Sequence, residues 1–197
     1  MGNIRLRLVF ALTINFALIS IAMGDSSNKQ TDQLTLFDFQ ANNNPADWVI
    51  VNDGVMGGLS RSEIDLPEGG AAVFRGVVSL ENNGGFASTR TTSRNYDLGG
   101  YSGILIQVKG DGKRYQFRMR AGDRFDGVSY RCHFETEANK WMIIRVPFAE
   151  CTPVFRGRVL PDVAPISAEH IQQLGFLISD KQQGPFKLEI KWIRAFR

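Results

Sequence analysis

The chain has 197 residues, 43% of them hydrophobic and 22% charged, a balance typical of a globular domain with a sizeable core rather than a disordered or fibrous chain. Two histidines and two cysteines are too few to suggest a Cys/His zinc cage. Net charge falls from +3 to +1 if a leader carrying two arginines is removed, because 23 basic residues become 21 against 20 acidic ones. A nearly neutral chain gives no reason to expect nucleic acid as a partner.

Residues 1–24 have the features of a secretory signal peptide. Two arginines precede a largely apolar run over residues 8–23. Small residues stand at positions 22 and 24, the two positions that a signal peptidase recognises before the cleavage site. A mitochondrial presequence is the alternative, because acidic residues are absent until Asp25, although such presequences are amphipathic. The run is short for a span of about 20 residues. We expect an exported protein, periplasmic or extracellular, without a membrane span after cleavage; a retained anchor is the other outcome.

After the leader, residues 25–33 read as a flexible polar lead-in, and residues 34–197 as one domain. Short apolar stretches alternate there with Gly, Asn and Pro turns, a pattern typical of strands. Strands are expected over residues 34–39, 48–51, 59–64, 71–80, 85–91, 101–109, 115–121, 128–135, 141–148, 175–179 and 186–196, with one short helix over 167–174. This pattern, with at most one or two short helices, indicates an all-β antiparallel β-sandwich, which it does not distinguish from a barrel.

Two hairpins are predicted within this pattern. An Asn-Gly pair lies between strands 71–80 and 85–91, and strands 128–135 and 141–148 face each other across a turn. The second register places Cys132 opposite Ile144 and leaves Cys151 about seven residues away. At ~3.3 Å per residue this offset exceeds disulfide reach, unless the chain folds back across the sandwich. We therefore expect two reduced, buried cysteines.

The stretch Asn52–Ser60 joins two expected strands and concentrates residues suited to tight turns. It combines an Asn-Asp pair with three glycines, and Asp53 is the only ionisable residue between Trp48 and Arg61. Its carboxylate is expected either to accept hydrogen bonds within its own turn or to face a ligand. Because such turns are common, the structural role is favoured.

No catalytic constellation appears with a recognisable spacing. Asp53 and Glu63 are the nearest approach to a glycosidase carboxylate pair, but two carboxylates ten residues apart occur in almost any sequence. His133 on a strand and His170 on the expected helix are more often structural or solvated than catalytic. We expect a protein that is not an enzyme and that has no cofactor and no metal site.

Side-chain alternation predicts a polar face rich in arginine. Tyr115, Phe117 and Met119 alternate with Gln116, Arg118 and Arg120, and the expected hairpin at 128–148 continues the pattern. Arginine forks bind carboxylates, phosphates or sugar hydroxyls, and an aromatic ring adds a stacking platform. An ordinary solvated face, with arginines paired to Glu135 and Glu137, is the alternative. The candidate binding residues on this face and at its rim are Asp53, Arg61, Arg118, Arg120, Arg131, Trp141 and Arg145.

Several motifs follow in a specific order and spacing from about residue 37 to 196. They are Asn52–Ser60, Glu81–Ser88, Gly110–Tyr115, Trp141 with Val146–Phe148, Arg156–Arg158, Gly175–Ile178 and Gly184–Ile190. In this order the chain resembles the complex I intermediate-associated protein family, whose mitochondrial members assist assembly of NADH:ubiquinone oxidoreductase. The resemblance implies a galactose-binding-like jelly roll, an architecture shared with several carbohydrate-binding modules. It implies a non-catalytic binding or assembly module with a protein partner, or alternatively an exported module that binds a glycan through the arginine and aromatic face.

Overall fold

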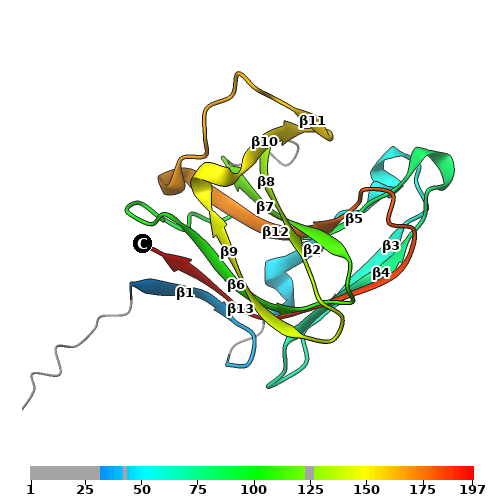
Figure 1. Ribbon diagram of the computed structural model, residues 1–197, viewed down its shortest axis with the longest axis horizontal. Helices are drawn as coiled ribbons and strands as arrows, with labels where there is room; N and C mark the ends of the chain where they lie inside the picture. The colour runs from blue at the N-terminus through cyan, green and yellow to red at the C-terminus, as the bar shows by residue number, and fades with distance from the viewer. Residues whose placement is uncertain (1–31, 42–43, 123–126) are drawn as a thin grey trace, which may run out of the picture. The chain divides into compact units, whose positions relative to one another are not determined.

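Two antiparallel β-sheets pack face to face in the structure, a computed structural model that describes residues 32–41, 44–122 and 127–197 (Figure 1). All of these residues belong to one unit, Thr31–Arg197. The expected leader, residues 1–24, and most of the expected lead-in lie outside the described residues. Within the described ranges, no helix is both long enough and apolar enough to cross a membrane.

The first sheet, called sheet A, has the strand order β3-β4-β13-β6-β9, and β1 also pairs with β13. Its strands are β1 (Gln33–Asp38), β3 (Arg61–Asp65), β4 (Ala72–Val78), β6 (Gly103–Lys109), β9 (Trp141–Pro147) and β13 (Gly184–Phe196). The second sheet, sheet B, has the order β11-β10-β8-β7-β12-β5-β2. Its strands are β2 (Trp48–Ile50), β5 (Ala87–Thr91), β7 (Arg114–Ala121), β8 (Ser129–Glu135), β10 (Thr152–Phe155), β11 (Arg158–Val159) and β12 (Ile171–Ile178).

Helical structure in the described part of the chain is limited to five short 3₁₀ turns. These are η1 (Pro45–Asp47), η2 (Asp53–Met56), η3 (Glu81–Asn83), η4 (Phe148–Glu150) and η5 (Ala168–His170). The predicted all-β antiparallel sandwich is therefore confirmed.

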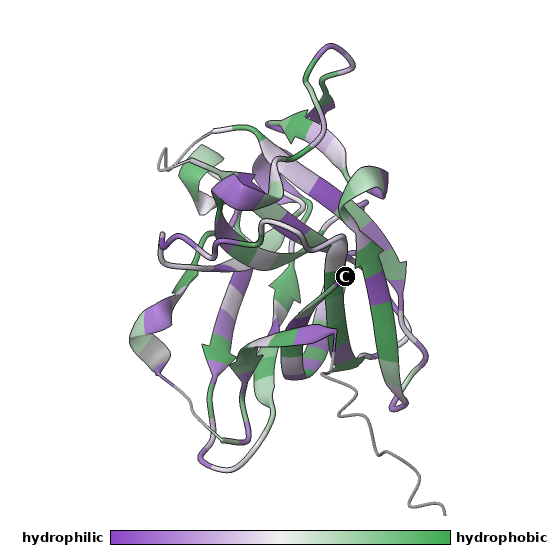
Figure 2. Cartoon of the chain, turned by 90° about the vertical axis from the view of Figure 1, so that its left-hand side faces the viewer, coloured by the Kyte–Doolittle hydropathy of each residue, from purple (hydrophilic) through white to green (hydrophobic). Residues whose placement is uncertain are grey.

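The core lies between the two sheets and follows from the period-2 alternation of the strands, which Figure 2 shows as alternating hydrophobic and hydrophilic bands. On β7, Tyr115, Phe117 and Met119 are fully buried. Aromatic contacts join the layers, since the ring of Phe37 on β1 in sheet A lies 5.3 Å from that of Trp48 on β2 in sheet B. Each large side chain buried in this way contributes about 1.5 to 3 kcal/mol to stability.

Both predicted hairpins are wrong, because their turns carry the chain from one sheet to the other. β4 pairs with β3 and β13 in sheet A, whereas β5 pairs with β2 and β12 in sheet B. Likewise β8 lies in sheet B between β7 and β10, and β9 lies in sheet A beside β6. Two strands that each have one apolar face can bury both faces by packing across the sandwich, and this packing prevails here over side-by-side pairing.

The helix expected over residues 167–174 is also wrong. Only η5 is helical, and Ile171 begins β12, a strand paired with β7 on one side and β5 on the other. Ile171 and Leu174, within the range expected to be helical, are both fully buried in the sandwich. Pairing on both sides of a central strand outweighs a weak local preference for helix.

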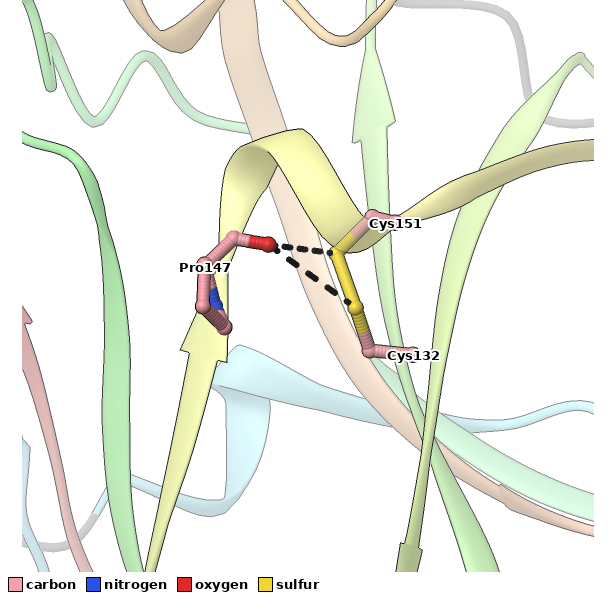
Figure 3. Close-up of a disulfide and its surroundings, with 3 residues drawn as sticks. All are labelled: Cys132, Pro147 and Cys151. Atoms are coloured by element: carbon pink, nitrogen blue, oxygen red, sulfur yellow. Dashed lines mark hydrogen bonds between the residues drawn. A yellow bond between two sulfur atoms is a disulfide. The ribbon is translucent and has the colours of Figure 1, made fainter.

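Cys132 and Cys151 form a disulfide, so the expectation of two reduced cysteines is wrong. The chain does fold back: after β9 it turns through η4 and joins sheet B as β10, where Thr152 pairs with Arg131. This brings the two cysteine Cα atoms within 4.9 Å, a normal disulfide separation. Both sulfur atoms approach the carbonyl oxygen of Pro147, at 4.0 Å from Cys132 and 3.4 Å from Cys151 (Figure 3). The bond ties β8 to the segment that crosses from sheet A to sheet B.

Candidate binding cleft

A cleft of about 580 Å³ opens on the face of sheet B that points away from sheet A. Strands β5, β7, β8 and β12 supply its floor. The η2 loop, with Val55 and Met56, lines it as well, and so does the turn between β10 and β11, with Arg156 and Gly157. A concave surface of this size, lined by both apolar and polar side chains, has the general character of a ligand site.

A row of arginines crosses the floor of this cleft. Arg131 on β8 pairs with Arg118 on β7, Arg118 pairs with Gly175 on β12, and Gly175 pairs with Arg90 on β5. Like charges placed directly opposite each other destabilise a sheet. The glycine in the row is needed for close strand approach, because a Cβ there would lie 2.5 Å from the carbonyl oxygen of Thr89. A local arrangement that costs stability is typical of a functional surface.

Among the described residues, Arg118 donates hydrogen bonds only to neutral groups. Its Nε and Nη2 donate to Gln116 Oε1 at 2.9 and 2.6 Å, and its Nη1 donates to Ser129 Oγ at 2.7 Å. Burial, followed by the positive charges of Arg120 and Arg131, lowers the pKa of Arg118 to about 10, so the guanidinium stays charged at neutral pH. Neutral acceptors orient this charge without cancelling it, which leaves it available to an anionic ligand.

The charges lining the cleft are strongly unequal. Among the described residues, five arginines line it, namely Arg90, Arg118, Arg120, Arg131 and Arg156, against one carboxylate, Asp180. Asp180 already accepts a hydrogen bond from Arg114 Nη2 at 2.6 Å. Burial raises the pKa of Asp180, but hydrogen bonds from Arg114 and Ser179 outweigh burial and hold it below its ordinary value. Among the described residues that line the cleft, arginines therefore outnumber carboxylates.

Gln173 adds a buried acceptor to the same surface. Its side chain lines the cleft and is only 8% exposed, and its Nε2 donates to the carbonyl oxygen of Thr91 at 3.2 Å. Its Oε1 accepts no hydrogen bond from the described residues. A buried acceptor without a donor costs free energy, so this oxygen is suited to a ligand N–H or O–H.

Asp53 supports the cleft from within the protein and is fully buried. Its Oδ1 accepts from the Ser60 N–H at 2.9 Å, and its Oδ2 accepts from Ser60 Oγ at 2.5 Å and from the N–H groups of Gly85 and Phe86 at 2.7 and 3.2 Å. Burial raises the pKa of Asp53, but these hydrogen bonds outweigh burial and hold the pKa below its ordinary value. The carboxylate fixes the η2 loop and has no accessible surface for a ligand.

The predicted face with four arginines is wrong, because its members lie on two different sheets. Arg118, Arg120 and Arg131 line the cleft of sheet B. Arg145 belongs to β9 of sheet A, where its guanidinium lies 3.7 Å from the ring centroid of Phe196. Trp141 lies on the same strand, with Lys109 Nζ 5.1 Å from its ring centroid.

Arg61, the other predicted rim residue, is exposed on β3 of sheet A, opposite Val77. The sequence interpretation missed Arg90, Arg156 and Gln173 as cleft residues. For Arg90 a signal was present, since it shares its strand parity with Ser88 and alternates with buried Ala87 and Thr89.

The other residues considered for a catalytic role, Glu63, His133 and His170, each contact other side chains of the protein. Glu63 is exposed and pairs with Arg75 at 2.7 Å. His133 lies beside Asp180, and burial lowers its pKa, while exposed His170 contacts Ser167 Oγ at 3.1 Å. Among the described residues, no group of three or more His, Cys, Asp and Glu side chains is arranged to hold a metal ion. Arginine side chains, of the kind that line the cleft, form strong hydrogen bonds with anionic groups.

The two antiparallel sheets, packed face to face, define the chain as a β-sandwich of the jelly-roll type with an arginine-lined cleft on one sheet. Its fold is similar to that of the family 11 carbohydrate-binding module of the cellulosomal cellulase Lic26A-Cel5E of Clostridium thermocellum, with a TM-score of 0.64 over 84% of this chain and 95% of that one. At 15% identity this similarity shows the fold alone.

The family is shown by sequence. The family model described as Complex I intermediate-associated protein 30 (CIA30) matches residues 37–190, and the chain belongs to this family. It is 26% identical over 180 residues to the mitochondrial complex I intermediate-associated protein 30 of Drosophila melanogaster and 26% identical over 169 residues to that of Mus musculus. These alignments cover 80% and 76% of this chain, but only 61% and 52% of the two relatives. The chain thus spans between half and two thirds of their length.

Proposed function

We propose that this chain is a non-catalytic binding module that holds a protein partner during assembly of NADH:ubiquinone oxidoreductase or a related respiratory complex. Membership of the complex I intermediate-associated family over residues 37–190 is the observation that carries this proposal. The relatives named for this role share the domain at 26% identity. The arginine-lined cleft of sheet B is the surface that we assign to the partner.

The chemistry of the cleft supports a binding role without catalysis. Its charged groups are arginines, which bind and orient anions but stay protonated at neutral pH and so do not act as general bases. Asp180, the one carboxylate among the described lining residues, accepts a hydrogen bond from Arg114. The buried carboxylate of Asp53 and the exposed pair of Glu63 with Arg75 supply no acid and base facing a common substrate.

A glycan is the alternative ligand, and two observations weigh against it. Trp141, the tryptophan expected to stack on a sugar, lies on sheet A and not in the cleft of sheet B. Among the described lining residues, the aromatic ones are Phe86 and Phe176, and Phe176 is fully buried in the core. A neutral sugar packs best on an exposed aromatic face, and the described lining residues offer little of one.

The disulfide supports an oxidising compartment for the domain, since such bonds persist outside the reducing cytosol. We propose export through the predicted signal peptide, with a mitochondrial location, as the names of the relatives suggest, as the alternative. N-terminal sequencing of the mature protein, together with cell fractionation, separates the two. An intact Met1 in a cytoplasmic fraction would contradict both.

Deletion of the gene in the source organism tests the assembly role. The amount of assembled NADH:ubiquinone oxidoreductase on native gels should fall, and the full chain supplied in trans should restore it. A glycan array run with the purified protein tests the alternative. Unchanged amounts of the complex after deletion would overturn the assembly role, and clear glycan binding would support the alternative.

A further inference from the structure

We propose that the cleft of sheet B binds an extended peptide segment of the partner in which acidic and apolar side chains alternate. This inference rests on the proposed function, because it names the chemistry of the partner that the module holds. Three features of the same surface carry it: the arginine row, the buried acceptor of Gln173, and the apolar rim of the η2 loop.

Charge is the first feature. In the described structure neither Arg118 nor Arg131 forms an ion pair, although the two side chains stand opposite each other on neighbouring strands. A carboxylate placed over them would receive planar bidentate hydrogen bonds and relieve their mutual repulsion. Complementarity to the guanidinium groups of Arg118 and Arg131 therefore favours an anionic ligand over a neutral one.

The buried acceptor is the second feature. Gln173 Oε1 lies in the cleft lining without a donor from the described residues, while the Nε2 of the same amide is fixed on the carbonyl oxygen of Thr91. This hydrogen bond sets which end of the amide is the oxygen. A ligand that satisfies Gln173 must bring an N–H or O–H donor in addition to its negative charge. A peptide brings a backbone amide N–H beside each carboxylate side chain, whereas a simple carboxylate brings none.

The apolar rim is the third feature and separates a peptide from an acidic glycan. Val55 and Met56 are 70% and 60% exposed on the η2 loop, and both line the cleft. The Asp53 hydrogen bonds hold this loop in place without partner contact, so its apolar side chains are presented at a fixed position. Exposed aliphatic side chains and a flexible thioether pack well against apolar residues of a peptide. A polyuronate offers no such side chains.

Three labelled probes test the inference by fluorescence polarisation with the purified full chain. The first is an octapeptide of four Leu-Glu repeats, the second is its Leu-Gln counterpart, and the third is a tetrasaccharide of galacturonic acid. The Leu-Glu peptide should bind at least tenfold more tightly than either of the others. Equal affinity for the two peptides, tighter binding of the galacturonate, or no measurable binding of the Leu-Glu peptide would each overturn the inference.

Variants locate the binding. Arg131→Gln should lower the affinity for the Leu-Glu peptide at least tenfold. The matched change Arg75→Gln, at an exposed site on sheet A, should leave this affinity unchanged. Equal weakening by both variants would show non-specific attraction and contradict the inference. Met56→Glu changes only an exposed side chain at the cleft rim, so the variant should fold normally. Its affinity for the Leu-Glu peptide should fall at least fivefold. An unchanged affinity would contradict the proposed apolar contact.

The two proposals fail in different experiments. A deletion strain that loses the respiratory complex, combined with no binding of the Leu-Glu peptide, would retain the proposed function and reject the acidic peptide. A peptide that binds as predicted, in a strain whose complex is unaffected by the deletion, would retain the ligand chemistry and reject the assembly role.

Discussion

Replacement of Asp53 by asparagine tests how the η2 loop is held. The variant keeps the size of the side chain and one oxygen for the Ser60 N–H, but it places an NH₂ group where Oδ2 now accepts from Ser60 Oγ, Gly85 N–H and Phe86 N–H. The serine hydroxyl can rotate and accept instead. The two backbone N–H groups cannot, and each would be left without an acceptor at a cost of about 1 to 3 kcal/mol. We expect a total loss of about 3 kcal/mol, allowing for the longer and weaker bond from Phe86.

Urea unfolding followed by tryptophan fluorescence measures this loss. Asp162→Asn is the matched control, because Asp162 is exposed and should tolerate the same change within about 0.5 kcal/mol. A free energy of unfolding for Asp53→Asn within that same margin of the wild type would refute the reasoning. It would mean that the buried carboxylate is not what fixes the loop.

The same pair of proteins gives a prediction for acid pH. Burial raises the pKa of Asp53, but hydrogen bonds from Ser60, Gly85 and Phe86 lower it further, so the folded pKa lies below the unfolded value near 4. A carboxyl group with a depressed folded pKa contributes stability above the unfolded pKa, and this contribution is lost as pH falls through the folded pKa. The stability gap between wild type and Asp53→Asn should therefore narrow below about pH 4. A gap that widens in acid would contradict the assigned hydrogen bonds.

Three further substitutions separate local from long-range contributions. Gly58→Ala should lower the free energy of unfolding by about 1 to 3 kcal/mol, because the added Cβ would lie 2.4 Å from the carboxyl carbon of Asp53. Gly54→Ala is the control and should not destabilise the fold, because its Cβ would meet nothing within 4 Å. Equal urea midpoints for the two variants would contradict this prediction. Changing both Cys132 and Cys151 to alanine should cost about 3 kcal/mol by opening a loop of 19 residues, and an unchanged midpoint would show that the crosslink is dispensable. Arg131→Gln should raise stability by about 0.5 kcal/mol, since it removes a like-charge cross-strand pair; a loss above about 1 kcal/mol would place this arginine in a structural network.

Local alternation was enough to predict which side chains on one strand share a face. The assignment of Arg118 and Arg120 to the polar side of residues 115–121 follows from the period of a strand alone, and it agrees with the cleft. Arg131 falls on the same surface because β7 and β8 are both consecutive in sequence and adjacent in sheet B. For these strands, neighbours in sequence are also neighbours in the sheet, so the alternation of side chains was sufficient to place the three arginines on one surface.

Sheet membership was not predictable in the same way. A turn between two amphipathic strands has the same sequence pattern whether it closes a hairpin or crosses to the opposite sheet. For this reason the sequence analysis assigned Arg145 to the wrong sheet. Arg90 reaches the arginine row only through Gly175, a residue 85 positions later in the chain. The disulfide depends on the same return of the chain to sheet B after β9. Contacts between residues so far apart in the sequence follow from the packing of the two sheets, and local sequence patterns do not encode them.

Photo-crosslinking from two matched positions tests most directly the claim that the cleft of sheet B is the binding surface. Benzoylphenylalanine replaces Met56 at the cleft rim in one protein and Ile143 on β9 of sheet A in the other; the native residues are 60% and 61% exposed. After irradiation in the source organism, the Met56 position should give a crosslinked adduct that mass spectrometry maps to an acidic segment of a partner protein, and the Ile143 position should give none. An adduct from Ile143 without one from Met56 would contradict the account and place the partner on sheet A.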